Sequence, residues 1–267
     1  MSGDHGGEFT SVDTAAYKSP MLNWPPLSKL FLIISLLVLD IASKNVWMSV
    51  FTGVVGLTLF MYGSLMRPPK VLMYLFIYAQ LMIIISAVLF MIVTPGATVT
   101  TVKFGITIHF TDAGINLATL IYARATVALL LLYSFAVSTP VPHLAEALRK
   151  IYVPDVFVEM MVLIYRYTFL LMETAESMHL AAECKFGYSN YRRSMGTTAK
   201  LIAGVFMRAL DTAERGEVAL QCRNYKGEFK SLSTVGKKNK AATALCVIIV
   251  IAGAVFFIML RYGVIIL

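Results

Sequence analysis

Long apolar runs separated by short polar segments organise most of the chain. They cover residues 30–42, 46–66, 71–93, 113–137 and 241–260. A helix needs ~20 apolar residues to cross the ~30 Å hydrocarbon core of a bilayer. The first run is shorter than this and would need local thinning of the bilayer. The pattern predicts an all-α polytopic membrane protein with about five transmembrane helices.

One segment has a different period. Between residues 97 and 112, apolar and polar side chains alternate, which is the pattern of a β-strand. The apolar positions are Val102, Phe104, Ile106, Ile108 and Phe110, and the polar ones are Lys103, Thr107, His109 and Thr111. We therefore expect a small extracytoplasmic hairpin or an extended loop here.

Residues 138–240 form a polar segment that is too long and too patterned to be a loop. It holds fifteen of the 23 basic residues and ten acids. A short amphipathic helix is expected at 143–151, and Pro154 should begin a long helix that runs to about Lys185. Gly196 is expected to separate it from a second long helix, Thr197 to about Arg223. The first half of the first long helix is mostly apolar but includes a few charged residues. This pattern suits a helix that lies across a membrane face.

The basic clusters give an orientation. The charged turn at 67–70 and the cluster at 237–240 belong on the cytoplasmic side by the positive-inside rule. We expect an N-terminal cytoplasmic tail at 1–27 and a four-helix transmembrane region at 28–137, with an extracytoplasmic loop at 94–112. A cytoplasmic region at 138–240 and a last transmembrane helix at 241–262 complete the chain. The expected location is the plasma or inner membrane, with the N-terminus in the cytoplasm.

Composition excludes an ordinary soluble domain. The chain is 58% hydrophobic and 14% charged, and its mean hydropathy is +0.74. The net charge of +8 is explained by the positive-inside rule, so we expect a lipid bilayer and no nucleic acid as partner. The three cysteines form no CxxC motif, and their number is odd, so they do not make a set of disulfide pairs. This argues against disulfides and a zinc site.

The sequence offers no catalytic machinery. It contains no P-loop, HExxH or GxSxG motif, and no span carries a pair of carboxylates. The four histidines, His5, His109, His143 and His179, do not cluster. We therefore expect no catalytic residue, no cofactor and no metal site on this chain.

Arg124 lies in the middle of the fourth apolar run. A lone arginine at the centre of a bilayer costs ~2.5–3.5 kcal/mol on insertion scales, so it should face the interior of the helix bundle. Two roles fit this position. One is a buried polar contact with backbone carbonyls or with an acid such as Asp40, and the other is a contact that positions a partner subunit.

A pattern of residues occurs twice in the polar segment, 38 residues apart. The first copy, at 173–185, reads ETAESMHLAAECK, and the second, at 211–223, reads DTAERGEVALQCR. The identical pairs are Thr174/Thr212, Ala175/Ala213, Glu176/Glu214, Ala181/Ala219 and Cys184/Cys222. Each copy ends in a basic residue four places after the shared alanine. Gly187 follows the first copy, and Asn224 and Gly227 follow the second.

Taken alone, each copy is typical of a capped helix end, because a terminal cation complements the helix dipole and a glycine permits a left-handed cap. The pair supports a second interpretation. An alanine at i and a cation at i+4 share one face, so a partner could approach closely beside the charge. Two such ends suit a partner that presents one acidic groove twice, such as a dimer of similar ATPase subunits.

These motifs give the chain a resemblance to the transmembrane T component of energy-coupling factor (ECF) transporters, and most of all to the cobalt-type, CbiQ-like branch. The resemblance covers nearly the whole chain. Its further motifs are the Pro-x-x-Lys-Leu-like run from Pro26 to Leu30, Arg124, Thr139-Pro140, Leu148-Arg149, Val153-Pro154 and Tyr165-Arg166-Tyr167.

The resemblance implies a non-enzymatic scaffold with long cytoplasmic coupling helices. Such a scaffold links two cytoplasmic ABC ATPase subunits to a substrate-binding, CbiM-like membrane subunit, here for cobalt uptake, with ATP hydrolysis on the partners. The implied ATPase-coupling residues are Ala181, Cys184, Lys185, Gly187, Ala219, Cys222, Arg223 and Asn224.

The chain departs from the family pattern at both copies. Cys184 and Cys222 replace alanines, Lys185 stands where the family usually has arginine, and Phe186 intervenes before Gly187. In the second copy Asn224 replaces glycine. Because lysine cannot make the two-pronged contact that arginine makes with a carboxylate, we expect Arg223 to make the stronger contact.

Other functions remain open at this stage. The chain could be a T component for nickel or a vitamin, or a stand-alone channel or carrier with a regulatory cytoplasmic segment. It could also be a membrane enzyme that binds an anionic lipid through Arg124, Tyr165 and Arg166.

Overall fold

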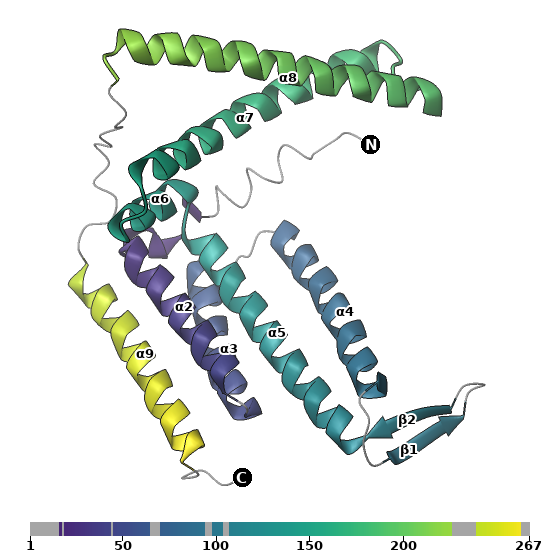
Figure 1. The fold of residues 1–267 in the computed structure, drawn as a ribbon, viewed down its shortest axis with the longest axis vertical. Helices are drawn as coiled ribbons and strands as arrows, with labels where there is room; N and C mark the ends of the chain where they lie inside the picture. Colours follow the sequence, from purple (N-terminus) through teal and green to yellow (C-terminus); the bar gives the residue numbers. More distant parts are fainter. Residues whose placement is uncertain are drawn as a thin grey trace. The chain divides into compact units, whose positions relative to one another are not determined.

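A computed structural model describes the protein over residues 16–17, 19–43, 45–64, 70–93, 98–103, 107–225 and 239–262. These residues divide into two compact units (Figure 1). Residues 16–143 and 239–262 form one, called the bundle unit below. Residues 144–225 form the other, called the α6–α8 unit.

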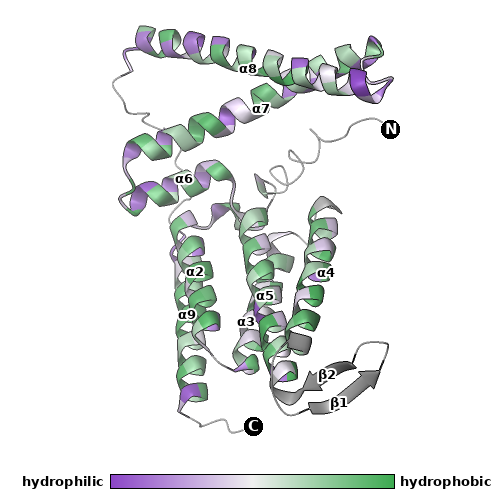
Figure 2. Cartoon of the chain, turned by 45° about the vertical axis from the view of Figure 1, so that its right-hand side comes forward, coloured by the Kyte–Doolittle hydropathy of each residue, from purple (hydrophilic) through white to green (hydrophobic). Residues whose placement is uncertain are grey.

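The bundle unit consists of apolar helices and one hairpin. Its helices are η1 (Pro20–Asn23), α2 (Pro26–Ala42), α3 (Val46–Gly63), α4 (Lys70–Val93), α5 (Asp112–Ser138) and α9 (Lys240–Arg261). Within the unit, α3 packs along α5, α4 packs on another side of α5, and α2 packs on α9. Hydrophobic residues dominate these helices (Figure 2), and many of them are exposed.

Four of these helices are long and apolar enough to cross a membrane: α3, the Leu72–Met91 part of α4, the Gly114–Ser138 part of α5, and α9. The fold is therefore that of an all-α polytopic membrane protein. With 17 residues, α2 is about 25 Å long, shorter than the ~30 Å hydrocarbon core. This is the short first run that the sequence indicated.

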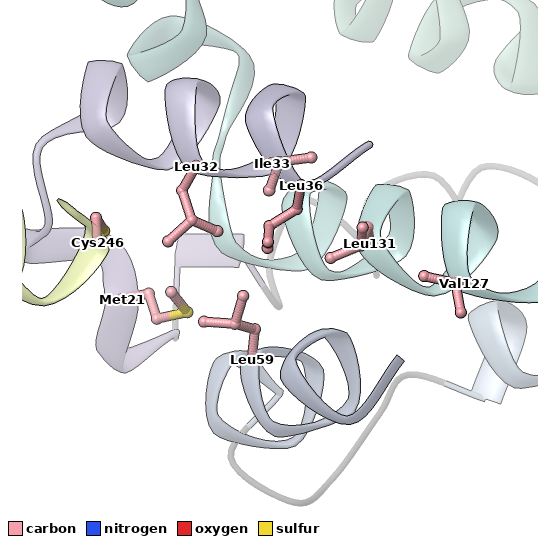
Figure 3. Close-up of a cluster of buried hydrophobic side chains, with 8 residues drawn as sticks. All are labelled: Met21, Leu32, Ile33, Leu36, Leu59, Val127, Leu131 and Cys246. Carbon is pink, nitrogen blue, oxygen red and sulfur yellow. The ribbon is translucent and has the colours of Figure 1, made fainter. Parts of the chain in front are cut away.

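The core of the bundle unit forms where α2 meets η1, α3 and α5. Leu32, Ile33 and Leu36 of α2 lie close to Leu59 of α3 and to Leu131 of α5 (Figure 3). Met21 of η1 joins them and is 4% exposed. The last part of the segment expected as an N-terminal tail at 1–27 is therefore folded, because burying Met21 fixes the chain before α2.

Two charged side chains are buried in the bundle unit. Lys29, 2% exposed, donates a hydrogen bond of 2.8 Å from Nζ to the carbonyl of Ser138, the last residue of α5. The cation thus satisfies a carbonyl that has no partner within its own helix and complements the negative end of the helix dipole. Asp40, 1% exposed, accepts hydrogen bonds from Ser49 Oγ (2.7 Å) and Thr52 Oγ1 (3.2 Å).

The alternating segment forms an antiparallel hairpin, as its period predicted. Its strands are β1 (Thr98–Lys103) and β2 (Thr107–Thr111). Val102 pairs with Ile108 and Lys103 with Thr107, with an irregularity between Thr98 and Thr100. The hairpin joins the end of α4 to the start of α5.

The α6–α8 unit is built on three helices: α6 (Val141–Lys150), α7 (Asp155–Cys184) and α8 (Tyr191–Cys222). The expected break at Gly196 is wrong, because α8 begins at Tyr191 after Asn190 and runs through this glycine. One glycine costs a helix only about 1 kcal/mol. The turn at 185–190 already ends α7, so the chain needs no second break.

The helices α7 and α8 form an antiparallel hairpin joined at one end (Figure 1). Two glycines of α8 allow it to approach side chains of α7. A Cβ atom on Gly216 would lie 2.6 Å from the hydroxyl of Tyr167, and one on Gly204 would meet the end of Met178. The pairs fall in order along both helices, so the hairpin keeps one register over most of its length.

Candidate functional site

The first repeat copy ends α7 in a Schellman cap. The N–H of Gly187 donates to the carbonyl of Ala182 (2.9 Å), and the N–H of Phe186 donates to the carbonyl of Glu183 (2.9 Å). Between the helix and this closing bond, Phe186 adopts a left-handed conformation with φ 54°. These are the two bonds and the one backbone conformation that define the motif.

The second copy ends α8 in the same way. The N–H of Tyr225 donates to the carbonyl of Leu220 (3.1 Å), and the N–H of Asn224 donates to the carbonyl of Gln221 (3.0 Å). Asn224 has φ 54°, the same value as Phe186. The sequence repeat is therefore also a repeat of backbone geometry at the same offset.

Gly187 does not occupy the left-handed position that was expected of a glycine here. That position belongs to Phe186, one residue earlier. Gly187 instead lets neighbouring atoms pack closely against its Cα. A Cβ atom there would lie 2.9 Å from the carbonyl oxygen of Ala182 and 2.9 Å from the methyl carbon of Thr197. Thr197 Oγ1 donates to the carbonyl of Gly187 (2.9 Å) and so ties the start of α8 to the end of α7.

The two cations of the repeat occupy the same place in their caps. Lys185 and Arg223 are the C-cap residues that directly follow α7 and α8, and both are exposed. Among the residues that the structure describes, neither forms an ion pair. Each lies at the negative end of a helix dipole, where a cation is favoured, and each is free to meet an acidic partner.

The small residues predicted beside these cations are also on the surface. Ala181, Ala219, Cys184 and Cys222 are exposed, and both cysteines are free thiols. Of the eight predicted coupling residues, only Gly187 is partly buried. A partner could thus reach the cation and its small neighbours at either helix end.

The structure does not bring the two copies together. The first lies at the closed end of the α7–α8 hairpin and the second at the far end of α8, which has 32 residues. A helix of that length spans about 48 Å. The two exposed cations therefore lie at two separate places on the α6–α8 unit.

Sequence reasoning missed a polar cluster that holds the second helix end in place. The carboxylate of Glu159 in α7 is 6% exposed and accepts a hydrogen bond from the hydroxyl of Tyr225. Arg149 of α6 lies 2.6 Å from a carboxylate oxygen of Asp155 and 3.9 Å from one of Glu159. A signal was present, because an acid such as Glu159 in an apolar helix segment requires a partner.

The cluster changes the acidity of Tyr225. The hydrogen bond to Glu159, followed by burial and by the charge of the same carboxylate, raises the pKa of Tyr225 above its ordinary value near 10. All three effects disfavour a phenolate beside a carboxylate. At neutral pH Tyr225 is therefore a stable hydrogen-bond donor.

A groove of about 490 Å³ runs beside the second copy, between α7 and α8. Arg166 and Glu173 of α7 line it together with Ala219 and Arg223 of α8. Apolar side chains of both helices complete its walls. Arg223 thus stands at a concave surface.

Arg124 does not pair with Asp40, which has Ser49 and Thr52 as partners instead. Its half-buried side chain carries a buried Nε atom that finds no hydrogen-bond partner among the residues that the structure describes. The expected contact with Asp40 is wrong because the hydroxyl groups of Ser49 and Thr52, one turn apart on α3, already satisfy that carboxylate. Arg124 keeps an unused donor.

Among the described residues, no group of three or more potential metal ligands comes together. His179 makes a local contact, with Nδ1 2.9 Å from the hydroxyl of Tyr188. His5 lies outside the described residues.

Known proteins share this sequence pattern. A protein-family model, CbiQ, described as a cobalt transport protein, matches residues 17–235. The cobalt transport protein CbiQ of Rhodobacter capsulatus is 35% identical over 142 residues, which cover 53% of this chain and 58% of that protein.

Two other relatives match over more of the chain. An uncharacterized protein of Methanocaldococcus jannaschii is 29% identical over 232 residues, covering 84% of each chain. A putative fused cobalt transport protein CbiMQ of Methanocorpusculum labreanum is 25% identical over 230 residues, which cover 81% of this chain and 36% of that protein. With its family match over most of its length, the chain belongs to the CbiQ family of cobalt transport proteins.

Proposed function

We propose that this protein is the scaffold and coupling subunit of an ECF-type ABC importer for cobalt. It links two cytoplasmic ATPases to a substrate-binding membrane subunit and converts their nucleotide-driven movement into movement of that subunit. The plasma or inner membrane holds the complex, and the N-terminus of this chain is cytoplasmic.

One observation carries the proposal: the chain ends two long helices with the same cap and exposes one cation at each end. The caps agree in both hydrogen bonds and in the φ value of the left-handed residue. Because α8 has 32 residues and so spans about 48 Å, a single small acidic ligand could not bridge the two cations. Two copies of one acidic surface, on two ATPase subunits, fit this arrangement.

The fused relative supports the second partner. The name CbiMQ describes a protein in which a CbiM part and a CbiQ part share a chain. Parts that function together are commonly the ones that fuse. We therefore propose a separate CbiM-like membrane subunit as the partner that binds the metal, while this chain has no substrate site of its own.

The proposed role requires no enzymatic activity from this chain. The ATPase partners supply the energy, and this chain transmits force between them and the metal-binding subunit. A rigid cytoplasmic unit suits that task, and both the Thr197–Gly187 bond and the Tyr225–Glu159 bond brace the α7–α8 hairpin.

The test is a double charge reversal, Lys185→Glu with Arg223→Glu, in the complete complex. We expect the variant to insert in the membrane and to lose co-purification with the ATPases. The matched control is Lys200→Glu with Arg208→Glu, which reverses two exposed charges within α8 and should keep the ATPases. Stoichiometric ATPase binding by the first variant would show that the helix ends are not the coupling sites.

Two other functions can be separated by transport measurements. A stand-alone channel or carrier predicts metal flux in liposomes that contain this chain alone. A T component for nickel or a vitamin predicts uptake of that substrate, and not of Co²⁺, by the assembled complex. Flux that requires the ATPases and the membrane partner together, with Co²⁺ as substrate, is the result we expect.

A further inference from the structure

Phe186 occupies a backbone conformation that its side chain disfavours. Its φ of 54° lies in the left-handed region, which glycine enters freely and asparagine tolerates, whereas a bulky side chain is strained there. The cap bonds and the Thr197–Gly187 bond fix this conformation, so the feature to explain is that a phenylalanine stands at this position. Asn224, at the equivalent position of the second copy, has the same φ with little strain.

The strain at Phe186 is not offset by burial. Its residue is 75% exposed, although phenylalanine is among the residues most often found inside proteins. Its carbonyl accepts a hydrogen bond from the N–H of Ser189 (3.3 Å), a contact that any residue could make. The aromatic ring therefore has no evident role in holding this unit together.

The ring follows directly after the cation of the first copy. Lys185 offers a point charge, whereas Arg223 offers a planar group that can bind a carboxylate through two hydrogen bonds. The weaker cation is paired with the aromatic Phe186, and the stronger one with the small polar Asn224. The two helix ends thus differ in a way that could balance their binding strengths.

The surroundings of Phe186 favour a protein surface over a lipid surface. Glu183 and Lys185 of the same turn are both exposed. Inserting the ring into hydrocarbon would bring the Glu183 carboxylate towards the membrane, where charge is costly. A protein pocket can take up the ring and still leave its polar neighbours in water.

We propose that Phe186 is an apolar anchor that inserts into a pocket of the ATPase subunit contacted by Lys185. This inference rests on the proposed coupling function. At the first helix end, the partner surface would combine an apolar pocket with a neighbouring carboxylate. At the second, it would offer a carboxylate that the guanidinium group of Arg223 binds through two hydrogen bonds. Aromatic anchors of this kind carry a large share of the energy at protein interfaces.

The first experiment uses Phe186→Asn, which gives the first copy the residue that the second copy has. The full chain in nanodiscs should become equally or more stable to heat, because asparagine adopts the left-handed conformation more easily. Its affinity for the purified ATPases should fall about tenfold or more. A variant whose stability is kept or raised while its affinity for the ATPases falls identifies Phe186 as an anchor and not as a structural residue. Unchanged affinity would overturn the proposal.

Tyr152 supplies a matched control. It follows the end of α6 with φ 63° and is 96% exposed, so its strain and exposure are similar. The cations before it, Arg149 and Lys150, differ from Lys185 because they pair with Asp155 and Glu146. Tyr152→Asn should relieve strain in the same way and leave ATPase affinity unchanged. An equal loss of affinity in both variants would show that the effect is not specific to the first repeat copy.

The second experiment places a probe at the anchor. In a chain with Trp24→Phe and Trp47→Phe, Phe186→Trp leaves one tryptophan, since the sequence has two. Its emission should shift to shorter wavelength when the ATPases are added, and brominated phospholipids should not quench it before then. Quenching by these lipids in the absence of ATPases would assign the ring to the membrane and overturn the proposal.

The coupling function and the Phe186 anchor can be tested separately. If the unaltered chain does not bind the ATPases, the proposed function falls. If it binds them, Arg223→Glu does not, and Phe186→Asn binds as tightly as the unaltered chain, then only the anchor falls.

Discussion

The hydroxyl of Tyr225 donates a hydrogen bond to the buried carboxylate of Glu159, across 66 residues of sequence. Tyr225 follows Asn224 directly at the end of α8, and its N–H also closes the cap of that helix. Glu159 lies in the second turn of α7 and faces Arg149 of α6. One side chain thus fixes the end that carries Arg223 onto the corner between α6 and α7.

Replacing Tyr225 by phenylalanine should loosen this helix end. The Schellman cap would survive, because it uses the backbone N–H, while the link to α7 would be lost. We expect the amides of residues 223–225 to exchange with deuterium about two- to tenfold faster, which corresponds to the loss of one hydrogen bond. Amides of residues 185–187, at the other helix end, should be unchanged and serve as the internal control. Equal exchange in both proteins would mean that the hydroxyl does not restrain the end of α8.

The same contact predicts a pH dependence. The pKa of Tyr225 is raised in the folded protein, so between its ordinary value near 10 and the raised value the folded state keeps a proton that the unfolded state has lost. The stability that this contact gives the folded protein is therefore fully present below about pH 10. It declines as the pH rises through the raised pKa of Tyr225. Protection of the α8 end should be constant from pH 6 to 9 and fall in more alkaline solution. In Tyr225→Phe the alkaline decline should be absent.

Two glycines of the α6–α8 unit should respond in opposite directions to alanine. At Gly187 the new Cβ would meet the backbone oxygen of Ala182, which cannot rotate away, as well as Thr197. We expect Gly187→Ala to destabilise the unit by about 1–3 kcal/mol. At Gly196 a Cβ meets nothing within 4 Å, so Gly196→Ala should stabilise α8 by up to about 1 kcal/mol. Thermal unfolding of both variants in the same detergent tests the pair. A loss at Gly196 would contradict the continuous helix.

The repeat shows what the sequence could and could not predict about the site. Matching residues at a constant offset predicted two equivalent helix ends, and their caps agree bond for bond. The left-handed residue was assigned to the glycine by preference, yet the closing hydrogen bonds place it at Phe186. Which residue takes that conformation depends on where the last helical turn closes, and local preference does not decide this when a tertiary bond such as Thr197–Gly187 competes.

In the bundle unit, too, the sequence predicted the helices but not the partners of a buried charge. Apolar runs predicted four helices long enough to span a membrane, and a short first helix. Hydropathy could not predict the partners of Asp40, because both hydroxyl groups come from ordinary positions of α3. Opposite charge made Arg124 the obvious candidate. Two hydroxyl donors nearby satisfy a carboxylate without the cost of burying a second charge.

Arg124 offers the last prediction, about the membrane partner. Along α5 and α3, Val127 faces Gly53 and Leu131 faces Gly56, and this register places Arg124 level with Ser49 and Val50. Its Nε atom lacks an acceptor there, so Arg124→Met should leave the isolated chain as stable as before or more stable. If Arg124 positions the CbiM-like subunit, the same variant should lose co-purification of that subunit while keeping the ATPases. Asp40→Ala is the contrasting variant: it strips an acceptor from Ser49 and Thr52 and should cost about 1–3 kcal/mol. A comparable loss of stability in Arg124→Met would instead make the arginine part of the fold.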